Sequence, residues 1–324
     1  MNSPTPSVAQ RLLAPARWRA WEIAAWALIW AAPIALPQHA ALINEIVILA
    51  LFALSLDVIL GYAGIVSLGH AAFFGLGAYG AALFAKHVMP DPLVGLAVGT
   101  LLGGLLGALT SPMIVRGTDL TRLMVTMGVA LVLLELANKF DDITGGADGL
   151  QGVLIGPLLG HFEFDLGARV ASFYSLAVLF LAFLLLRRLV RSPLGVSLQA
   201  LRDNRLRVMV LGLSVNGRLA AVYTLGAALA GAAGALLAQT TGFASLDVLE
   251  FHRSADVMTA LIIGGTGWLW GGLVGAIAFK VLHDLLSAIT PQYWTFWIGL
   301  ILVVLMLVGR ERLLSPRRWF GRRA

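Results

Sequence analysis

Three short segments interrupt the long apolar runs of this chain, and they hold the residue types that could carry a function. The first is residues 61–70, which has three glycines in nine positions and then a histidine. Helices continue poorly through closely spaced glycines, and a broken helix leaves backbone N–H and C=O groups free to line a pathway. A simple turn between two helices is the alternative interpretation. The candidate pathway residues here are Gly61, Tyr62, Gly64, Ser67, Gly69 and His70.

The second segment, residues 263–272, has five glycines in nine positions and two tryptophans. Glycine suits a sharp hairpin because it adopts positive φ without strain. Trp268 and Trp270 suit the interface between membrane and water. A structural turn and a functional gate are both consistent with this composition. The candidate gate residues are Gly264, Gly265 and Gly267.

The third segment, residues 192–212, predicts an amphipathic helix that is too short to cross a membrane. Its leucines recur near helical spacing, while charged residues take the other side, and Asp203 and Arg207 have the spacing of an ion pair. Such a helix lies on the lipid surface or docks into the groove of a partner. The candidate docking residues are Gly195, Ala200, Leu201, Arg202, Asp203, Asn204, Arg205 and Gly212.

The residue inventory excludes several catalytic chemistries. The chain has no cysteine, which removes disulfides, thiol catalysis and Cys-ligated metal sites. No lysine follows a glycine, so the G-x-x-x-x-G-K-[ST] phosphate loop of ATPases is missing, and the scattered histidines and acids predict no metal site. Carboxylates inside a membrane are costly and are therefore functional candidates. Of Glu45, Asp57, Glu135, Asp256 and Asp284, only Glu135 lies well inside a predicted span, so a proton relay is a secondary hypothesis.

The composition then decides where these segments must sit. The 324 residues are 59% hydrophobic and 12% charged, far from the roughly 45–50% and about 25% of soluble domains. A soluble protein with this many apolar residues would have too few polar residues to cover its surface, whereas a bilayer accepts an apolar surface. Spanning a bilayer requires helices or a closed barrel, and the apolar runs lack the alternation of barrel strands. The predicted fold class is an all-α, polytopic membrane protein.

Runs of about 20 apolar residues are long enough to cross the hydrocarbon core. By that measure we predict about ten passes, with eight or nine as the alternative. The eighth is too short to span alone, so it is broken or extends into its glycine-rich end, and a cleaved signal peptide is the alternative for the first. The passes are 20–36, 41–60, 70–87, 93–115, 123–138, 170–186, 219–238, 255–266, 272–288 and 294–309.

The basic residues predict the orientation. Most of the 23 Lys and Arg residues fall on one side when the N-terminus is placed inside, and the largest opposite connection, 139–169, is acidic. The prediction is N-in and C-in, which also explains the net charge of +6 without nucleic-acid binding. The chain divides into a cytoplasmic tail of 1–19, a transmembrane domain of 20–309 with its cytoplasmic loop at 187–218, and a basic cytoplasmic tail of 310–324.

A family resemblance begins at Gly61. The sequence from there reads GYAGIVSLGHA and soon continues with FFGLGAY, which closely resembles the branched-chain amino-acid permease family of bacterial ABC importers, above all its second, M-type subunit. Three further stretches agree in the expected order, namely TGGADGL at 144–150, the 192–212 segment and residues 263–275. The outer loop thereby adds further candidate pathway residues, which are Thr144, Gly145, Gly146, Asp148 and Gly149.

The resemblance implies a membrane subunit that pairs with a related permease, two cytoplasmic ABC ATPase subunits and a periplasmic substrate-binding protein. ATP and Mg would then bind the ATPases, with no cofactor on this chain, and the 192–212 helix would be the coupling helix in a bacterial inner membrane. Asp57 replaces the family's usual asparagine, and residues 120–122 and 126–128 also depart from its pattern. The implied substrates are amino acids, most of all branched-chain ones, with urea, amides or aromatic acids as alternatives in the family. An ion-coupled secondary transporter is the alternative from another class, and a membrane enzyme would need a clustered catalytic set that the chain lacks.

Overall fold

The structure is a computed structural model, and it describes residues 18–165, 167–289, 291–293, 296–301 and 303. Helices make up the fold, and the described residues include no strand beyond isolated bridges. The elements are α2 (Ala20–Ala35), η2 (Pro37–His39), α3 (Ala40–Asp57), η3 (Val58–Tyr62), α4 (Ala71–His87), α5 (Pro92–Arg116), α6 (Asp119–Lys139), α7 (Asp141–Thr144), η4 (Gly146–Asp148), α8 (Arg169–Val190), α9 (Pro193–Asp203), α10 (Arg205–Val210), α11 (Val215–Thr241), η5 (Leu246–Leu249), α12 (Phe251–Gly264) and α13 (Leu269–Ile289).

A helix lies at each of the first nine predicted passes, and the tenth falls largely outside the described residues. Six helical stretches of the described chain are long and apolar enough to cross a membrane, so the protein is a multi-pass membrane protein. The six are Pro37–Tyr62, Pro92–Arg116, Asp119–Lys139, Arg169–Val190, Val215–Thr241 and Leu269–Ile289. The helices α2, α4 and α12 are shorter, as the sequence predicted for the eighth pass.

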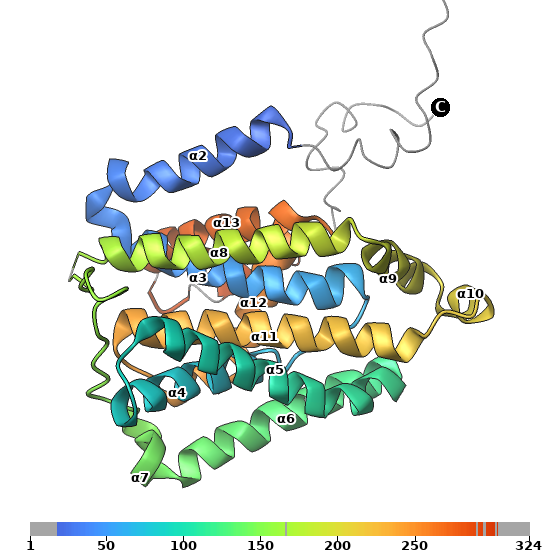
Figure 1. Ribbon diagram of the computed structural model, residues 1–324, viewed down its shortest axis with the longest axis horizontal. Helices are drawn as coiled ribbons and strands as arrows, with labels where there is room; N and C mark the ends of the chain where they lie inside the picture. Colours follow the sequence, from blue (N-terminus) through green and yellow to red (C-terminus); the bar gives the residue numbers. More distant parts are fainter. Residues whose placement is uncertain (1–17, 166, 290, 294–295, 302, 304–324) are drawn as a thin grey trace, which may run out of the picture.

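The centre of the bundle is α11, which packs against α3, α4 and α5 (Figure 1). Small residues make this packing possible because they let helix backbones approach closely. A Cβ at Gly103 of α5 would lie 2.6 Å from the carbonyl oxygen of Ala227 in α11, and one at Gly234 of α11 would clash with the carbonyl of Phe74 in α4. The glycine-rich runs at 103–107 and 230–235 therefore serve helix packing.

The long helices run along the longest axis of the molecule, and two ends can be distinguished (Figure 1). One, called here the α9 end, carries α9 and α10, and the other, the α7 end, carries α7 and the loop that leads to α8. Helix α3 runs from the α7 end towards the α9 end, where it passes into η3, a π-helical turn. The chain then leaves helical geometry at residues 64–69, so the predicted break after Gly61 is confirmed.

The N-terminal helix α2 is attached to α8 and α13 by aromatic rings and one ion pair. Trp26 contacts Phe183 at 5.1 Å and Trp270 at 5.6 Å between ring centroids, and Arg187 binds Glu22 at 2.7 Å. Trp268 is 44% exposed, whereas Trp270, two residues later, is only 6% exposed. Trp270 is buried because α2 covers the start of α13.

Candidate functional site

The break in α3 is tied to the hairpin between α12 and α13. The carboxylate of Asp57 is fully buried, and its Oδ1 accepts a hydrogen bond from the backbone N–H of Gly267 at 2.7 Å. Gly61 packs against both groups, because a Cβ there would clash with Asp57 Oδ1 and with the nitrogen of Gly267. Gly267 itself has a φ of +75°, which glycine adopts without strain. The two glycine-dense segments of the sequence therefore meet.

Arg202 of α9 completes this contact from the third segment. Its guanidinium donates a hydrogen bond to the carbonyl oxygen of Gly61, at the open end of η3. A Cβ on Gly267 would lie 2.9 Å from Arg202 Nη1, and one on Gly64 would lie 3.2 Å from Arg202 Cγ. We call Asp57, Gly61, Gly64, Arg202 and Gly267 the glycine junction. It brings one predicted docking residue into contact with three predicted pathway residues.

A polar and aromatic layer around His70 lies next to the glycine junction, on the side of the α7 end. The imidazole Nε2 is 2.8 Å from Ser55 Oγ, and the ring stacks on Phe52 at 5.2 Å between centroids. Its Nδ1 has no hydrogen-bond partner among the residues that the structure describes. Phe52 also contacts Phe74 at 4.5 Å. The predicted pathway residue His70 is thus a fully buried core residue.

The other predicted residues of the first two segments are buried packing positions. Tyr62 is 4% and Ser67 1% exposed, and a Cβ at Gly69 would clash with the backbone of Thr126 in α6. Gly264 lies where α12 crosses α13, and a Cβ there would lie 2.7 Å from the Cα of Gly275. Gly265 turns the chain with a φ of +97°. These residues shape the surroundings of the glycine junction.

The predicted residues of the outer loop are far from the glycine junction, at the α7 end. Gly145, Gly146 and Gly149 all have positive φ, and Thr144 closes the end of α7 by donating to the carbonyl of Phe140 at 2.8 Å. With Asp148 they form a tight turn, which pairs with the end of α11 through the bridge between Leu150 and Ala244. The family resemblance grouped them with the pathway, and the structure places them at the α7 end, where Gly149 packs against Phe243.

The predicted docking helix is divided in two. Asn204 has extended backbone angles, φ −158° and ψ 99°, and its side chain caps α10 by accepting from the N–H of Arg207 at 3.0 Å. The single helix and the Asp203–Arg207 ion pair were therefore wrong predictions, since no such pair forms in the described part of the chain. An asparagine side chain favours a helix start over a helix interior, and here it interrupts the helix.

Two of the three arginines in this segment bind the membrane domain, whereas Arg207 is exposed. Arg202 binds Gly61, and Arg205 donates to the carbonyl of Val115 at 3.1 Å and to Asn216 Oδ1 at 3.2 Å. The exposed surface mixes polar residues, among them Gln199, Asp203 and Arg207, with several large apolar side chains. The most exposed of its large apolar side chains are Val196, Leu206, Met209, Val210 and Leu211. The remaining predicted residues divide between buried Gly195 and Leu201 and exposed Ala200, Asp203 and Gly212.

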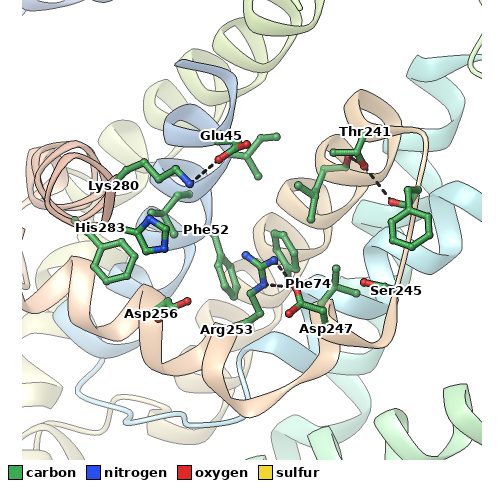
Figure 2. A pocket seen from close by; sticks show the side chains of 16 residues that line it. Glu45, Phe52, Phe74, Thr241, Ser245, Asp247, Arg253, Asp256, Lys280 and His283 are labelled. Atoms are coloured by element: carbon green, nitrogen blue, oxygen red, sulfur yellow. Dashed lines mark hydrogen bonds and ion pairs between the residues drawn. The ribbon is translucent and has the colours of Figure 1, made fainter. Parts of the chain in front are cut away.

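Towards the α7 end, a cavity of about 450 Å³ opens between α3, α4, α11, η5, α12 and α13 (Figure 2). Phe52 and Phe74 line it, so the layer around His70 separates the cavity from the glycine junction. Its lining residues are Glu45, Ile48, Leu49, Phe52, Phe74, Leu237, Thr241, Phe243, Ser245, Asp247, Val248, Arg253, Asp256, Phe279, Lys280 and His283.

Ion pairs cross the surface of this cavity (Figure 2). Lys280 Nζ lies 2.6 Å from Glu45 Oε2, and Arg253 Nε donates to Asp247 Oδ2 at 2.9 Å. Sequence reasoning missed the cavity because six separate elements build it. One signal existed, since Lys280 is a lysine inside a predicted pass. Glu135, the carboxylate favoured from sequence, lies on an exposed face of α6 and lines none of this cavity.

Comparison with known proteins shows the family of the chain. The model of the family described as branched-chain amino acid transport system permease component matches residues 39–308. The high-affinity branched-chain amino acid transport system permease protein LivM of Salmonella typhimurium is 30% identical over 293 residues, which cover 82% of this chain and 67% of that protein. LivH of Escherichia coli is 23% identical, with coverage of 80% and 88%. The autoinducer 2 import system permease protein LsrC of an Enterobacter species is 30% identical, with coverage of 72% and 68%. No solved structure matches the chain.

Proposed function

Because the chain belongs to the family of branched-chain amino acid transport permease components, we propose that it forms the translocation pathway of an ABC importer for amino acids. The observation that carries this proposal is the extent of the family match, which runs from residue 39 to residue 308 and includes the helices α3 to α13. The branched-chain amino acids are the favoured substrates, since the relatives LivM and LivH are named for their transport. Urea, amides and aromatic acids are the alternatives within the family.

We place the α9 end in the cytoplasm and the α7 end in the periplasm of a bacterial inner membrane. Arg187, Arg188, Arg191, Arg202, Arg205, Arg207 and Arg218 lie in or beside the loop that carries α9 and α10. The connection at the α7 end carries more acids than bases, so the arginine asymmetry supports N-in and C-in. In this orientation α2, α4, α12 and the segment around 294–309 complete about ten passes.

The ATPases supply the energy in this proposal, and α10 is where one of them docks. Leu206 is 74% exposed and Val210 88% exposed at the cytoplasmic tip, which is the apolar anchor that an interface core requires. ATP-driven closure of the ATPases would move α9, and Arg202 would transmit that movement to the carbonyl of Gly61. The break in α3 then becomes the hinge of alternating access.

The other partners contact different surfaces. The periplasmic binding protein would dock at the α7 end, next to the opening of the cavity. A related permease subunit would cover part of the exposed apolar faces of α5 and α6, where Leu101, Leu105 and Leu131 are more than half exposed. The existence of both LivM-type and LivH-type relatives supports a pair of unlike subunits.

Reconstitution tests this function. The permease, its sister subunit, the ATPases and the binding protein are purified and placed in liposomes, and uptake of labelled leucine, isoleucine and valine is measured. We expect uptake that requires ATP and the binding protein, and competition by other branched-chain amino acids but not by urea, amides or phenylalanine. Uptake driven by a proton or sodium gradient without ATPases would replace this proposal with the ion-coupled transporter.

A further inference from the structure

The cavity near the α7 end has two kinds of wall. Its apolar surface comes from Phe52, Phe74, Val248 and Phe279, and its charged surface comes from Glu45, Asp247, Arg253, Asp256 and Lys280 (Figure 2). Its volume of about 450 Å³ falls in the range of roughly 300–1,000 Å³ that small-molecule sites occupy. The cavity is therefore large enough for a small ligand that is apolar at one end and charged at the other.

Most of the charges in the cavity already have partners. Lys280 binds Glu45 at 2.6 Å, and Arg253 binds Asp247 through Nε at 2.9 Å and through Nη2. Both hydrogen bonds of Arg253 use one edge of the guanidinium. Its remaining nitrogen, Nη1, makes no hydrogen bond to any residue that the structure describes. The cavity thus offers one unused cationic donor.

Asp256 offers the complementary acceptor. Its side chain is partly buried, lines the cavity, and has no hydrogen bond or ion pair within the described chain. His252, Arg253 and His283 act on this carboxylate electrostatically without hydrogen-bonding to it, so its oxygens are free to accept hydrogen bonds from a ligand. Asp256 lies three residues after Arg253 on α12, so the two side chains project from the same face of the helix.

We propose that this cavity binds the zwitterionic head of an α-amino acid on its way through the permease. Asp256 accepts hydrogen bonds from the ammonium group, Arg253 Nη1 donates to the carboxylate, and the apolar wall receives the side chain. Both head groups are attached to one carbon, so they require an anion and a cation that are close neighbours, as residues 253 and 256 are. Charge-assisted hydrogen bonds of this kind are stronger than neutral ones. This inference rests on the proposed function and adds the residues that recognise the substrate.

The proposal makes the site selective for zwitterions. A leucine analogue without its ammonium group would leave Asp256 unpaired, and one without its carboxylate would leave Arg253 unpaired. Sites that hydrogen-bond a polar group strongly reject analogues that lack that group, because buried polar atoms are then left unsatisfied. The matching probes are leucine, 4-methylpentanoate and isopentylamine, which have the same side chain and differ in their charges.

The absence of cysteine from the chain allows a direct test of binding. Ser245 lines the cavity and carries none of the proposed contacts, so a Ser245→Cys substitution places a single reporter thiol there. In the purified complex without ATP or binding protein, leucine should slow maleimide labelling of this cysteine at least tenfold. The two singly charged analogues should not slow it at the same concentration. A cysteine in place of Leu154, which is 78% exposed and lies outside the cavity, is the control and should label equally with and without leucine.

Two charge variants complete the test. In proteoliposomes, Asp256→Asn should lower the kcat/KM of leucine uptake at least tenfold and abolish protection of the reporter. Glu250→Gln, a similar change one residue before α12 that lies outside the cavity, should stay within twofold of the unchanged protein. Co-purification with the ATPases should be unchanged in both variants, which separates the loss of a contact from misfolding.

The results distinguish this site from the function on which it rests. Leucine uptake by the unchanged importer together with normal uptake by Asp256→Asn, or with no protection by leucine, would overturn the site and leave the proposed function standing. Protection by either singly charged analogue would also overturn it. An unchanged importer that takes up no branched-chain amino acid with ATP and its binding protein would overturn both.

Discussion

Asp57 is completely buried, and its Oδ1 is held by the backbone N–H of Gly267. The position of this carboxylate between α3 and the α12–α13 hairpin indicates a structural role as a hydrogen-bond acceptor. Arg202 approaches the same place and binds the carbonyl of Gly61, so a charged side chain from α9 reaches a helix end inside the bundle. Glycine is required around these contacts because any larger side chain at residue 61 or 267 would occupy their space.

Substitution of Asp57 separates an acceptor from a proton carrier. Asp57→Asn keeps an oxygen for the Gly267 N–H, so we expect uptake within about threefold of the unchanged protein. Asp57→Leu leaves that buried donor unsatisfied at a cost of about 1–3 kcal/mol and should strongly reduce uptake and thermal stability. Both are measured by reconstituted transport and by melting of the purified protein. Loss of uptake in Asp57→Asn without loss of stability would instead favour the ion-coupled alternative.

Gly267 provides a second test at the residue scale, with Gly160 as a matched control. Both have a φ of +75°, but a Cβ at Gly160 meets nothing within 4 Å, while one at Gly267 lies 2.9 Å from Arg202 Nη1. Alanine at either position costs roughly 1–2 kcal/mol of backbone strain. We expect Gly267→Ala or Gly267→Val to abolish uptake and Gly160→Ala to retain it. Equal uptake in the two alanine variants would show that the space around Gly267 is only permissive.

At the scale of elements, α9 and α10 divide the task that the sequence assigned to one helix. Helix α9 buries Leu198 and Leu201 against the bundle and sends Arg202 to the glycine junction. Helix α10 turns away at Asn204 and exposes apolar side chains at its tip, among them Leu206 and Val210. Both helices therefore contact the membrane domain, and the apolar tip of α10 is available for a partner.

This division predicts two different defects. Leu206→Glu with Val210→Glu places charges in an apolar interface, so ATPase subunits should no longer co-purify and uptake should stop. Arg202→Ala should keep the ATPases bound, because this side chain faces Gly61, yet reduce uptake at least tenfold through loss of transmission. Pull-down and ATP-driven transport on the same preparations distinguish the defects. ATPase recovery that falls with Arg202→Ala but survives the double glutamate change would reverse the roles given to α9 and α10.

At the scale of the whole molecule, the sequence predicts helix positions well because the bilayer dictates them. A run of about 20 apolar residues indicates a transmembrane helix. The described helices start or end within a few residues of the predicted passes. The break at Gly61 was also predictable, since closely spaced glycines interrupt helices. These features depend on neighbours in the sequence.

Features that depend on distant residues were not predictable. The amphipathic pattern of 192–212 separated apolar from charged residues but did not reveal that the membrane domain itself offers a carbonyl to Arg202. The turn at 144–149 was grouped with the pathway by the family resemblance, which did not reveal that the turn packs against Phe243 and Ala244 at the α7 end. The cavity was missed for the same reason, because Glu45, Asp256 and Lys280 come together only when α3, α12 and α13 assemble.

The orientation is a testable property of the whole chain. A reporter that is active only in the cytoplasm should be active when fused after Arg205 or Arg318 and silent when fused within residues 145–165, because the arginine-rich connections stay inside. Activity is read from intact cells, with immunoblots to confirm equal amounts of each fusion. Activity of the fusions within 145–165 would overturn N-in and C-in.

The glycine junction also has a consequence for the order in which the protein is made. Gly61 lies 141 residues before its partner Arg202, and Asp57 lies 210 residues before Gly267. At about 5–20 residues per second, α3 leaves the ribosome tens of seconds before its last partner exists. During that interval the end of α3 has an unsatisfied carboxylate and an open carbonyl, so it must stay hydrated or close to the membrane surface. The end of α3 can therefore reach its final packing only near the end of synthesis. A chain that stops before the α12–α13 hairpin keeps unpaired polar groups at the end of α3, and quality-control proteases can recognise them.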